Sequence, residues 1–147
     1  MTLYFITGNA KKFKDAKHLL SQTEQITLDL PEIQELDPKK IIEAKLKEAI
    51  KHHEGTFFCE DTALYIDCLN GLPGPLIKWF LESIGNKGIA ELVHHYENHT
   101  ATAKTVVGYY DGNEMHFFEG EMKGRIVAPA GGNGFGWDVI FMPEGHT

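Results

Sequence analysis

The pattern of apolar and polar positions at the start of the chain predicts a strand that leads directly into a helix. Residues 3–7 form a short apolar run, and the apolar side chains that follow recur at helical spacing. We expect Leu3–Thr7 to be a buried strand and Asn9–Leu20 to be a helix. Phe13, Ala16, Leu19 and Leu20 would share the apolar face of this helix. Gln25–Leu30 has the pattern of a second strand.

A longer amphipathic helix is predicted from Asp37 onwards, because an acidic residue followed by proline is a strong helix start. Asp37 is suited to cap the helix, and Pro38 is suited to its first position. Apolar residues at positions 42, 46, 49 and 50 then share one face, out to about Glu54. Gly55 supplies the residue that ends the helix.

The second half of the chain alternates strand-like and helical segments. We expect strands at 56–60 and 64–67, a rigid loop at 70–75, and short helices at 76–84 and 87–95. A hairpin of 101–110 with 114–123 is predicted across Asp111-Gly112-Asn113. Residues 124–127 continue as a strand, and 139–142 form a last apolar segment. Since no repeat or linker interrupts this order, residues 1–147 are predicted to be a single α/β domain.

Composition and charge narrow the class of protein. The 147 residues, 42% hydrophobic and 24% charged, suit one globular domain. The net charge of −7, without a basic stripe in the sequence, argues against nucleic acid as a partner. The sequence has no apolar run that approaches a membrane span, and we expect neither a membrane partner nor a secretory signal. Cys59 and Cys68 are not in C-x-x-C spacing and fit a reducing compartment, so we expect a cytoplasmic protein.

The Thr-Gly-Asn-Ala-Lys-Lys turn at residues 7–12 is the strongest local signal for a ligand. A strand that turns through glycine into a helix points backbone N–H groups and the positive end of the helix dipole outward, which suits an anion. Asn9 is a candidate N-cap. Lys11 and Lys12 add full positive charges where a phosphate group would bind. Taken alone, the same hexapeptide also fits a capped helix with two solvated lysines.

Carboxylates from two separate segments are the candidate metal ligands. Glu32 follows Leu30-Pro31, and Glu60 and Asp61 come at the end of an apolar strand. Mg²⁺ prefers oxygen ligands and often bridges to substrate phosphates. These acids would form a polyphosphate site with the lysines at positions 11 and 12, provided that both sets meet in one cleft. Glu60-Asp61 also fits a plain turn at the end of a strand.

A glycine-rich stretch near the end of the sequence carries Phe135-Gly136-Trp137-Asp138. The two aromatic rings suit stacking on a nucleobase, and the Asp138 carboxylate suits hydrogen bonds from ring N–H groups. The same aromatic residues also fit a hydrophobic core. Between this segment and the carboxylates lies Gly-Leu-Pro-Gly-Pro-Leu-Ile-Lys-Trp-Phe, at residues 71–80.

These motifs, in this order, resemble the inosine triphosphate pyrophosphatase family, also called the noncanonical purine NTP pyrophosphatases. The resemblance rests on Thr-Gly-Asn-Ala-Lys-Lys, Leu-Pro-Glu, Glu-Asp-Thr, Gly-Leu-Pro-Gly-Pro…Ile-Lys-Trp-Phe and Phe-Gly-Trp-Asp, and it spans residues 3–145. It implies a mixed central sheet flanked by helices, as in the Maf-like fold. It also implies Mg²⁺-dependent hydrolysis of ITP, dITP and XTP to the monophosphate and pyrophosphate, by a homodimer.

The resemblance assigns roles to residues one by one. It implies that Asp61, Lys12 and Glu32 are catalytic residues. It implies that Glu32, Asp61 and Glu60 bind Mg²⁺. We expect Asp61 to be the general base for the attacking water or the metal ligand that activates this water. The positions that match substrate-binding residues are Thr7, Gly8, Asn9, Lys11, Lys12, Lys78, Phe135, Trp137 and Asp138.

The sequence departs from the family in two places. Family members continue beyond Pro143-Glu144-Gly145 with a segment whose lysine and Ser-His-Arg motif contact the base and its 6-keto group, and we expect this segment to be missing here. Val139 stands where the family usually has proline. Three alternatives stay open. One is a nucleotide-binding protein with little or no turnover, and another is a related NTP pyrophosphatase with an altered base preference. The third is a purely structural interaction domain that neither binds nor hydrolyses nucleotides.

Overall fold

The computed structural model describes residues 2–129 and 136–145, which divide into two compact units. The first unit comprises residues 1–61 and 106–119, and the second comprises residues 62–105 and 120–147. Each unit has a hydrophobic core of its own. Three long strands contribute residues to both units, namely β3 (Thr56–Ile66), β5 (Thr100–Tyr110) and β6 (Met115–Ile126).

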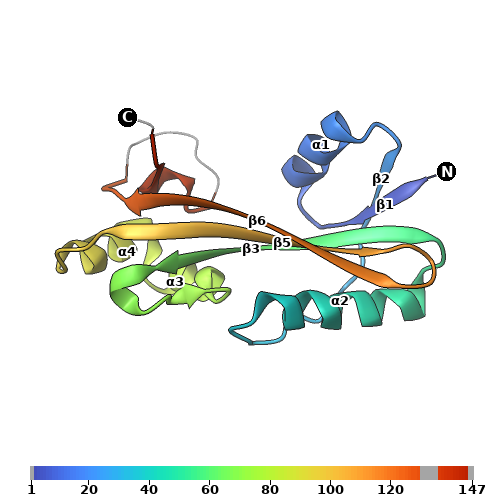
Figure 1. Ribbon diagram of the computed structural model, residues 1–147, viewed down its shortest axis with the longest axis horizontal. Helices are drawn as coiled ribbons and strands as arrows, with labels where there is room; N and C mark the ends of the chain where they lie inside the picture. Colours follow the sequence, from blue (N-terminus) through green and yellow to red (C-terminus); the bar gives the residue numbers. More distant parts are fainter. Residues whose placement is uncertain (1, 130–135, 146–147) are drawn as a thin grey trace. The chain divides into compact units, whose positions relative to one another are not determined.

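The first unit begins with parallel strands that have a helix on either side. β1 (Leu3–Ile6) pairs in parallel with both β2 (Thr23–Ile26) and the start of β3. The strand order in this unit is β2-β1-β3-β5-β6. Helices α1 (Ala10–Leu19) and α2 (Pro38–His52) lie on opposite sides of β1 and its neighbours (Figure 1).

Helix α2 begins where the sequence predicts, because Asp37 caps it. The Asp37 carboxylate accepts a hydrogen bond from the backbone N–H of Lys39 at 3.0 Å, and Pro38 is the first helical residue. The helix ends at His52, slightly before the predicted end. Gly55 follows with φ of +100°, a left-handed conformation that favours glycine.

Helix α2 packs closely on the sheet of the first unit. Gly108 of β5 makes this possible, because a Cβ atom there would lie 2.2 Å from Ile42 Cγ2 and 2.8 Å from Leu46 Cδ1. Both side chains are fully buried. The core that they join consists of Ile6, Ile42, Leu46, Ala49, Phe57, Cys59 and Val106.

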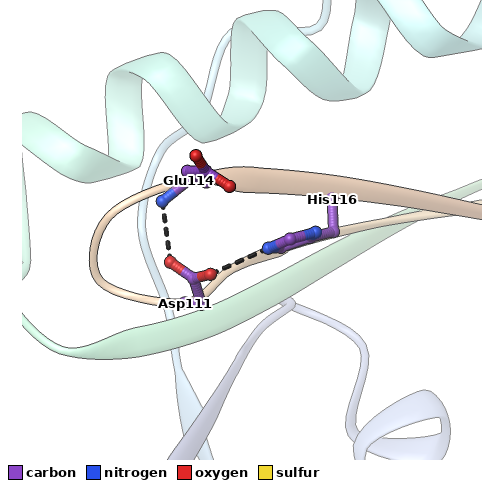
Figure 2. Close-up of side chains that lie close together, drawn as sticks. All are labelled: Asp111, Glu114 and His116. Carbon is purple, nitrogen blue, oxygen red and sulfur yellow. Dashed lines mark hydrogen bonds and ion pairs between the residues drawn. The ribbon is translucent and has the colours of Figure 1, made fainter.

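The predicted hairpin between β5 and β6 is confirmed, and Asp111 closes its turn. The Asp111 carboxylate accepts hydrogen bonds from the backbone N–H groups of Asn113 at 2.8 Å and Glu114 at 2.7 Å. Its second oxygen lies 2.8 Å from His116 Nε2 (Figure 2). The Glu114 amide, followed by the His116 ring and the Asn113 amide, lowers the pKa of Asp111 to about 2. Asp111, Glu114 and His116 thus lie close together because their hydrogen bonds close the turn of the hairpin.

The second unit adds short elements to the far halves of the long strands. β4 (Pro73–Gly74) pairs antiparallel with β3, and β7 (Phe141–Pro143) pairs antiparallel with β6. Because it contains both parallel and antiparallel pairs, the sheet is mixed, as predicted. Helices flank it, also as predicted. None of the helices within the described part of the chain is long and apolar enough to cross a membrane. The helical elements of this unit are η1 (Asp67–Leu69), α3 (Ile77–Ser83), α4 (Gly85–His94) and η2 (Asp138–Ile140).

The two cysteines are thiols without a disulfide, one in each unit. Cys59 of β3 lies in the core of the first unit, and burial raises its pKa to about 12. Cys68 of η1 packs against the core of the second unit, and burial is the main reason why its pKa is raised.

Two expectations about strands were wrong. The segments 56–60 and 64–66 belong to one strand, β3, while residue 67 begins η1, so Glu60-Asp61-Thr62 lies in mid-strand rather than at a strand end. The polar triplet resembles a break in sequence, but Glu60 and Asp61 line a polar cavity instead of turning the chain. β2 also starts and ends earlier than predicted, and its first residue, Thr23, is fully buried.

We expect Gly108→Ala to lower the free energy of unfolding by about 1–3 kcal/mol, because the added methyl group overpacks the contact between β5 and α2. Gly120→Ala is the matched control, since a Cβ atom there has no described heavy atom within 4 Å. The control should shift the free energy by less than roughly 0.5 kcal/mol. Urea unfolding followed by circular dichroism measures both. Equal stability of the two variants would contradict the close packing of α2 on Gly108.

Candidate functional site

A cavity of about 600 Å³ in the first unit gathers most of the residues that the sequence singles out. Its walls come from the end of β1, the start of α1, the segment after β2, helix α2 and the middle of β3. Lysine from the front of the chain and carboxylates from its middle therefore meet in one cleft, as a polyphosphate site requires. The predicted residues that line it are Thr7, Gly8, Asn9, Lys12, Glu32, Glu60 and Asp61.

The turn at residues 7–12 is held by its own side chains. Thr7 Oγ1 accepts a hydrogen bond from the Asn9 N–H at 3.1 Å. Asn9 Oδ1 accepts from the N–H groups of Lys11 and Lys12 at 3.0 and 3.1 Å, which confirms Asn9 as the N-cap. These three N–H groups bond within the turn, whereas the sequence predicted that such groups face a ligand. Positive charge in the cavity therefore comes from side chains and from the helix dipole.

Lys12 lines the cavity through an ion pair with β3. Its Nζ atom lies 2.6 Å from Glu60 Oε1, and the two side chains are 36% and 15% exposed. A charge-assisted hydrogen bond of this length holds both groups in place. The ammonium group of α1 is therefore fixed beside the carboxylates of the strand.

Burial changes the proton affinity of Asp61, one of the carboxylates that line the cavity. Its Oδ1 atom lies 4.0 Å from Lys45 Nζ, and its Oδ2 atom is buried without a hydrogen-bond partner among the described residues. Burial raises the pKa of Asp61 to about 6, with Lys45 opposing the change and Glu60 adding to it. A carboxylate that titrates near neutral pH and has an unbonded oxygen is suited to accept a proton or to bind a cation.

Lys45 and Asp29 also line the cavity, and sequence reasoning missed both. A signal for Lys45 exists, because it falls on the apolar stripe of α2 between Ile42 and Ala49, at helical spacing. Its side chain is only 12% exposed. A lysine on the buried stripe of an amphipathic helix indicates carboxylates nearby, and Lys45 pairs with Asp61. Asp29 follows β2 and has no comparable signal.

The residues predicted to bind a base belong to the second unit. The Trp137 ring lies 5.7 Å from Phe141 at an interplanar angle of 88°, and it packs against the core. Trp137, Asp138 and Phe141 also line a depression of about 640 Å³. Trp137 thus packs on the core, as one interpretation expects, and it also lines this depression, while base stacking stays a prediction. Phe135 lies outside the described residues.

Lys78 and Lys11 stay predictions as phosphate contacts. Lys78 lies on α3 in the second unit, where its Nζ atom is 5.5 Å from the centroid of the Trp79 ring. This distance is typical of a cation–π contact. Lys11 is exposed on α1 beside the cavity-lining Lys12.

Comparison with known sequences finds a family match over nearly the whole chain. The Ham1 family matches residues 3–147. The inosine triphosphate pyrophosphatase of Schizosaccharomyces pombe is 41% identical over 150 aligned residues, which cover 99% of this chain and 79% of the relative. The protein of the same name from Candida glabrata is 46% identical over 150 residues, covering 95% and 78%.

Comparison with solved structures agrees. A nucleoside-triphosphatase, described as a dITP/XTP pyrophosphatase, from Mycobacterium abscessus matches with a TM-score of 0.74 at 28% identity, covering 99% of this chain and 85% of that one. A HAM1 protein from Coxiella burnetii matches with a TM-score of 0.75 at 20% identity, covering 96% and 81%. At that identity the likeness concerns the fold, and it supports the predicted mixed sheet flanked by helices.

We expect Asp61→Asn to stabilise the protein in the absence of metal. Since the pKa of Asp61 is about 6 in the fold and 3.8 in an ordinary environment, ionised Asp61 opposes folding. The gain from the variant should be near zero below about pH 4, grow as pH rises through 6, and reach roughly 1–3 kcal/mol above about pH 7. Urea unfolding across this pH range measures it.

Asp15→Asn on the exposed side of α1 is the control for this measurement, because Asp15 is outside the cavity lining. We expect this control to change the free energy of unfolding little at any pH. A gain from Asp61→Asn that is equal at acidic and alkaline pH, or a loss at alkaline pH, would contradict the raised pKa.

Proposed function

The chain belongs to the Ham1 family, and from this premise we propose that it hydrolyses noncanonical purine nucleoside triphosphates such as ITP, dITP and XTP to the monophosphate and pyrophosphate. One observation carries the proposal: Lys12 and Lys45 lie beside Glu60 and Asp61 in a single cavity. The names of the fungal relatives and of the mycobacterial structure support it.

The phosphate tail binds on the lysine side of the cavity. Lys12 and Lys45 place positive charge next to the phosphate oxygens, and the N-terminal end of α1 adds its dipole. Thr7 and Asn9 hold the turn that presents this end. Gly8 leaves the turn open to a ligand, because a Cβ atom there would have no described heavy atom within 4 Å.

The carboxylates of the cavity fit Mg²⁺. Asp61 Oδ2 is a buried oxygen without a partner among the described residues, and Glu32 and Glu60 add oxygen atoms to the same lining. Four carboxylates, with Asp29 as the fourth, outnumber the two lysines, so a polyanion needs an accompanying cation to enter. We assign Mg²⁺ to Glu32, Glu60 and Asp61, where it would supply positive charge to the phosphate oxygens.

Asp61 accepts the proton of the attacking water. The water oxygen forms a bond to the α-phosphorus, the bond from this phosphorus to the bridging oxygen breaks, and pyrophosphate leaves with the electron pair. In the metal-free fold the pKa of Asp61 is about 6, so its carboxylate is mostly ionised above pH 7 and is suited either to take the proton or to bind the cation that activates the water. Lys45 stays beside the carboxylate and favours its ionised form.

The base contacts are assigned to Trp137, Asp138 and Phe135. The Trp137 ring offers a surface for stacking, and the Asp138 carboxylate accepts a hydrogen bond from a ring N–H group. A 6-keto purine carries such an N–H group at N1 and adenine does not, so Asp138 favours the 6-keto class. Lys78 and Lys11 are assigned to phosphate, and the protein is proposed to act as a homodimer.

Purified protein with Mg²⁺ should release pyrophosphate and monophosphate from ITP and XTP, and release them more slowly from ATP. We expect Asp61→Asn to lower kcat by at least about a hundredfold, because it removes the proton acceptor. Chromatography of the products, with pyrophosphate scored against orthophosphate, measures both. Binding of ITP in calorimetry without product would indicate a nucleotide-binding protein. Release from other triphosphates alone would indicate an altered base preference.

The lysines of α2 give a second test with a matched control. Lys45→Ala should lower kcat/KM for ITP by roughly tenfold or more, because it removes a charge from the phosphate side of the cavity. Lys47→Ala on the same helix removes an exposed lysine that pairs with Glu43 at 2.7 Å, and it should stay within roughly twofold of wild type. Equal effects of the two substitutions would count against the assigned phosphate site.

A further inference from the structure

We propose that Asn86 is a positioning residue for base recognition, because it holds the segment that carries Trp137 and Asp138. Asn86 lies in the first turn of α4, and its Nδ2 atom donates a hydrogen bond to the carbonyl oxygen of Gly136 at 2.8 Å. The role of the held segment rests on the proposed function. The hydrogen bond itself is a feature of the second unit alone.

The hydrogen bond from Asn86 is made directly before Trp137 and Asp138, the two residues that we call the base segment. Gly136 has φ of +58°, which favours glycine, and Trp137 follows it directly. A backbone carbonyl can only accept hydrogen bonds, so the Asn86 amide must present its nitrogen here. Because the Gly136 carbonyl and the Trp137 N–H belong to the same planar peptide group, holding one fixes the direction of the other.

Helix α4 is a firm support for this bond. Ile89, Ala90 and Val93 of α4 are buried in the same core as Ile140 of η2, and Trp137 packs against that core. The Trp137 ring is therefore held by apolar packing, while the hydrogen bond from Asn86 at the start of α4 holds the backbone next to Trp137. Loss of this hydrogen bond would leave the ring packed but would allow the backbone of Gly136 and Trp137 to move more freely.

Helix stability does not explain an asparagine at this position. Its Oδ1 atom is buried and has no hydrogen-bond partner among the described residues, which is unfavourable for an amide. Helix α4 has no side-chain cap and no acidic residue in its first turn. A carboxylate at position 86 would favour the helix through its dipole, but it could not donate to Gly136. Asn86→Asp therefore removes the hydrogen bond to Gly136 without weakening the helix, so it distinguishes the two roles.

The test compares Asn86→Asp with Asn98→Asp, the same substitution in the same unit. Asn98 Oδ1 accepts hydrogen bonds from the Thr100 N–H at 3.0 Å and from the Thr100 hydroxyl at 2.8 Å, and a carboxylate can accept both. We expect Asn86→Asp to raise KM for ITP roughly threefold to tenfold with little change in kcat, as for the loss of one hydrogen bond outside the reacting atoms. Asn98→Asp should match wild type.

Fluorescence of Trp137 gives a readout that does not depend on turnover. The chain has two tryptophans, so a Trp79→Phe background leaves Trp137 as the reporter. In that background Asn86→Asp should move the emission of the ligand-free protein to longer wavelength, and Asn98→Asp should leave it unchanged. If wild type releases no pyrophosphate, the proposed function fails, while the emission still decides whether Asn86 holds the segment.

Two results would overturn the proposal. The first is an Asn86→Asp protein with the KM and emission of the Asn98→Asp control. The second is a lower melting temperature with both of these readouts unchanged. Should Asn86→Asp not fold, Asn86→Gln and Asn86→Ala take its place. The glutamine keeps the donor and should stay closer to wild type in KM and emission than the alanine, and the reverse order would also overturn the proposal.

Discussion

The balance of charge around the middle of β3 is the constraint on which the first unit depends. Glu60 and Asp61 are adjacent carboxylates that are largely removed from water, and each repels the other. The strand tolerates them because Lys12 and Lys45 lie next to them. These lysines come from α1 and α2, so one short stretch of sheet fixes the side chains of both helices. A site for a charged ligand and the packing of the unit thus share the same contacts.

Much of the fold follows from local signals in the sequence. The caps at Asn9 and Asp37 and the turn at Asp111 each satisfy backbone groups within a few residues, so their effect can be read without knowing the fold. β3 was divided wrongly because three polar residues in a row look the same whether they turn the chain or line a polar cavity. Only the partners, which are distant in sequence, tell the two cases apart.

The site could be predicted to the extent that its residues stand in recognisable motifs. Lys45 stands outside them, yet its place on the apolar stripe of α2 was a usable signal, since a mostly buried lysine indicates carboxylates nearby. Asn86 had no such signal. Its partner is a backbone carbonyl 50 positions away, and carbonyls leave no trace in side-chain patterns. Contacts of this kind become visible only in coordinates.

The two native thiols make opening of the core around β3 observable by chemical modification, without an engineered cysteine. The thiolate is the reactive form of cysteine, and at Cys59 burial raises the pKa to about 12, so alkylating reagents reach it only when the core of the first unit opens. Cys68 is only partly buried and serves as an internal reference for the reagent. The ratio of the two alkylation rates therefore reports how often the core beneath the charged cavity opens.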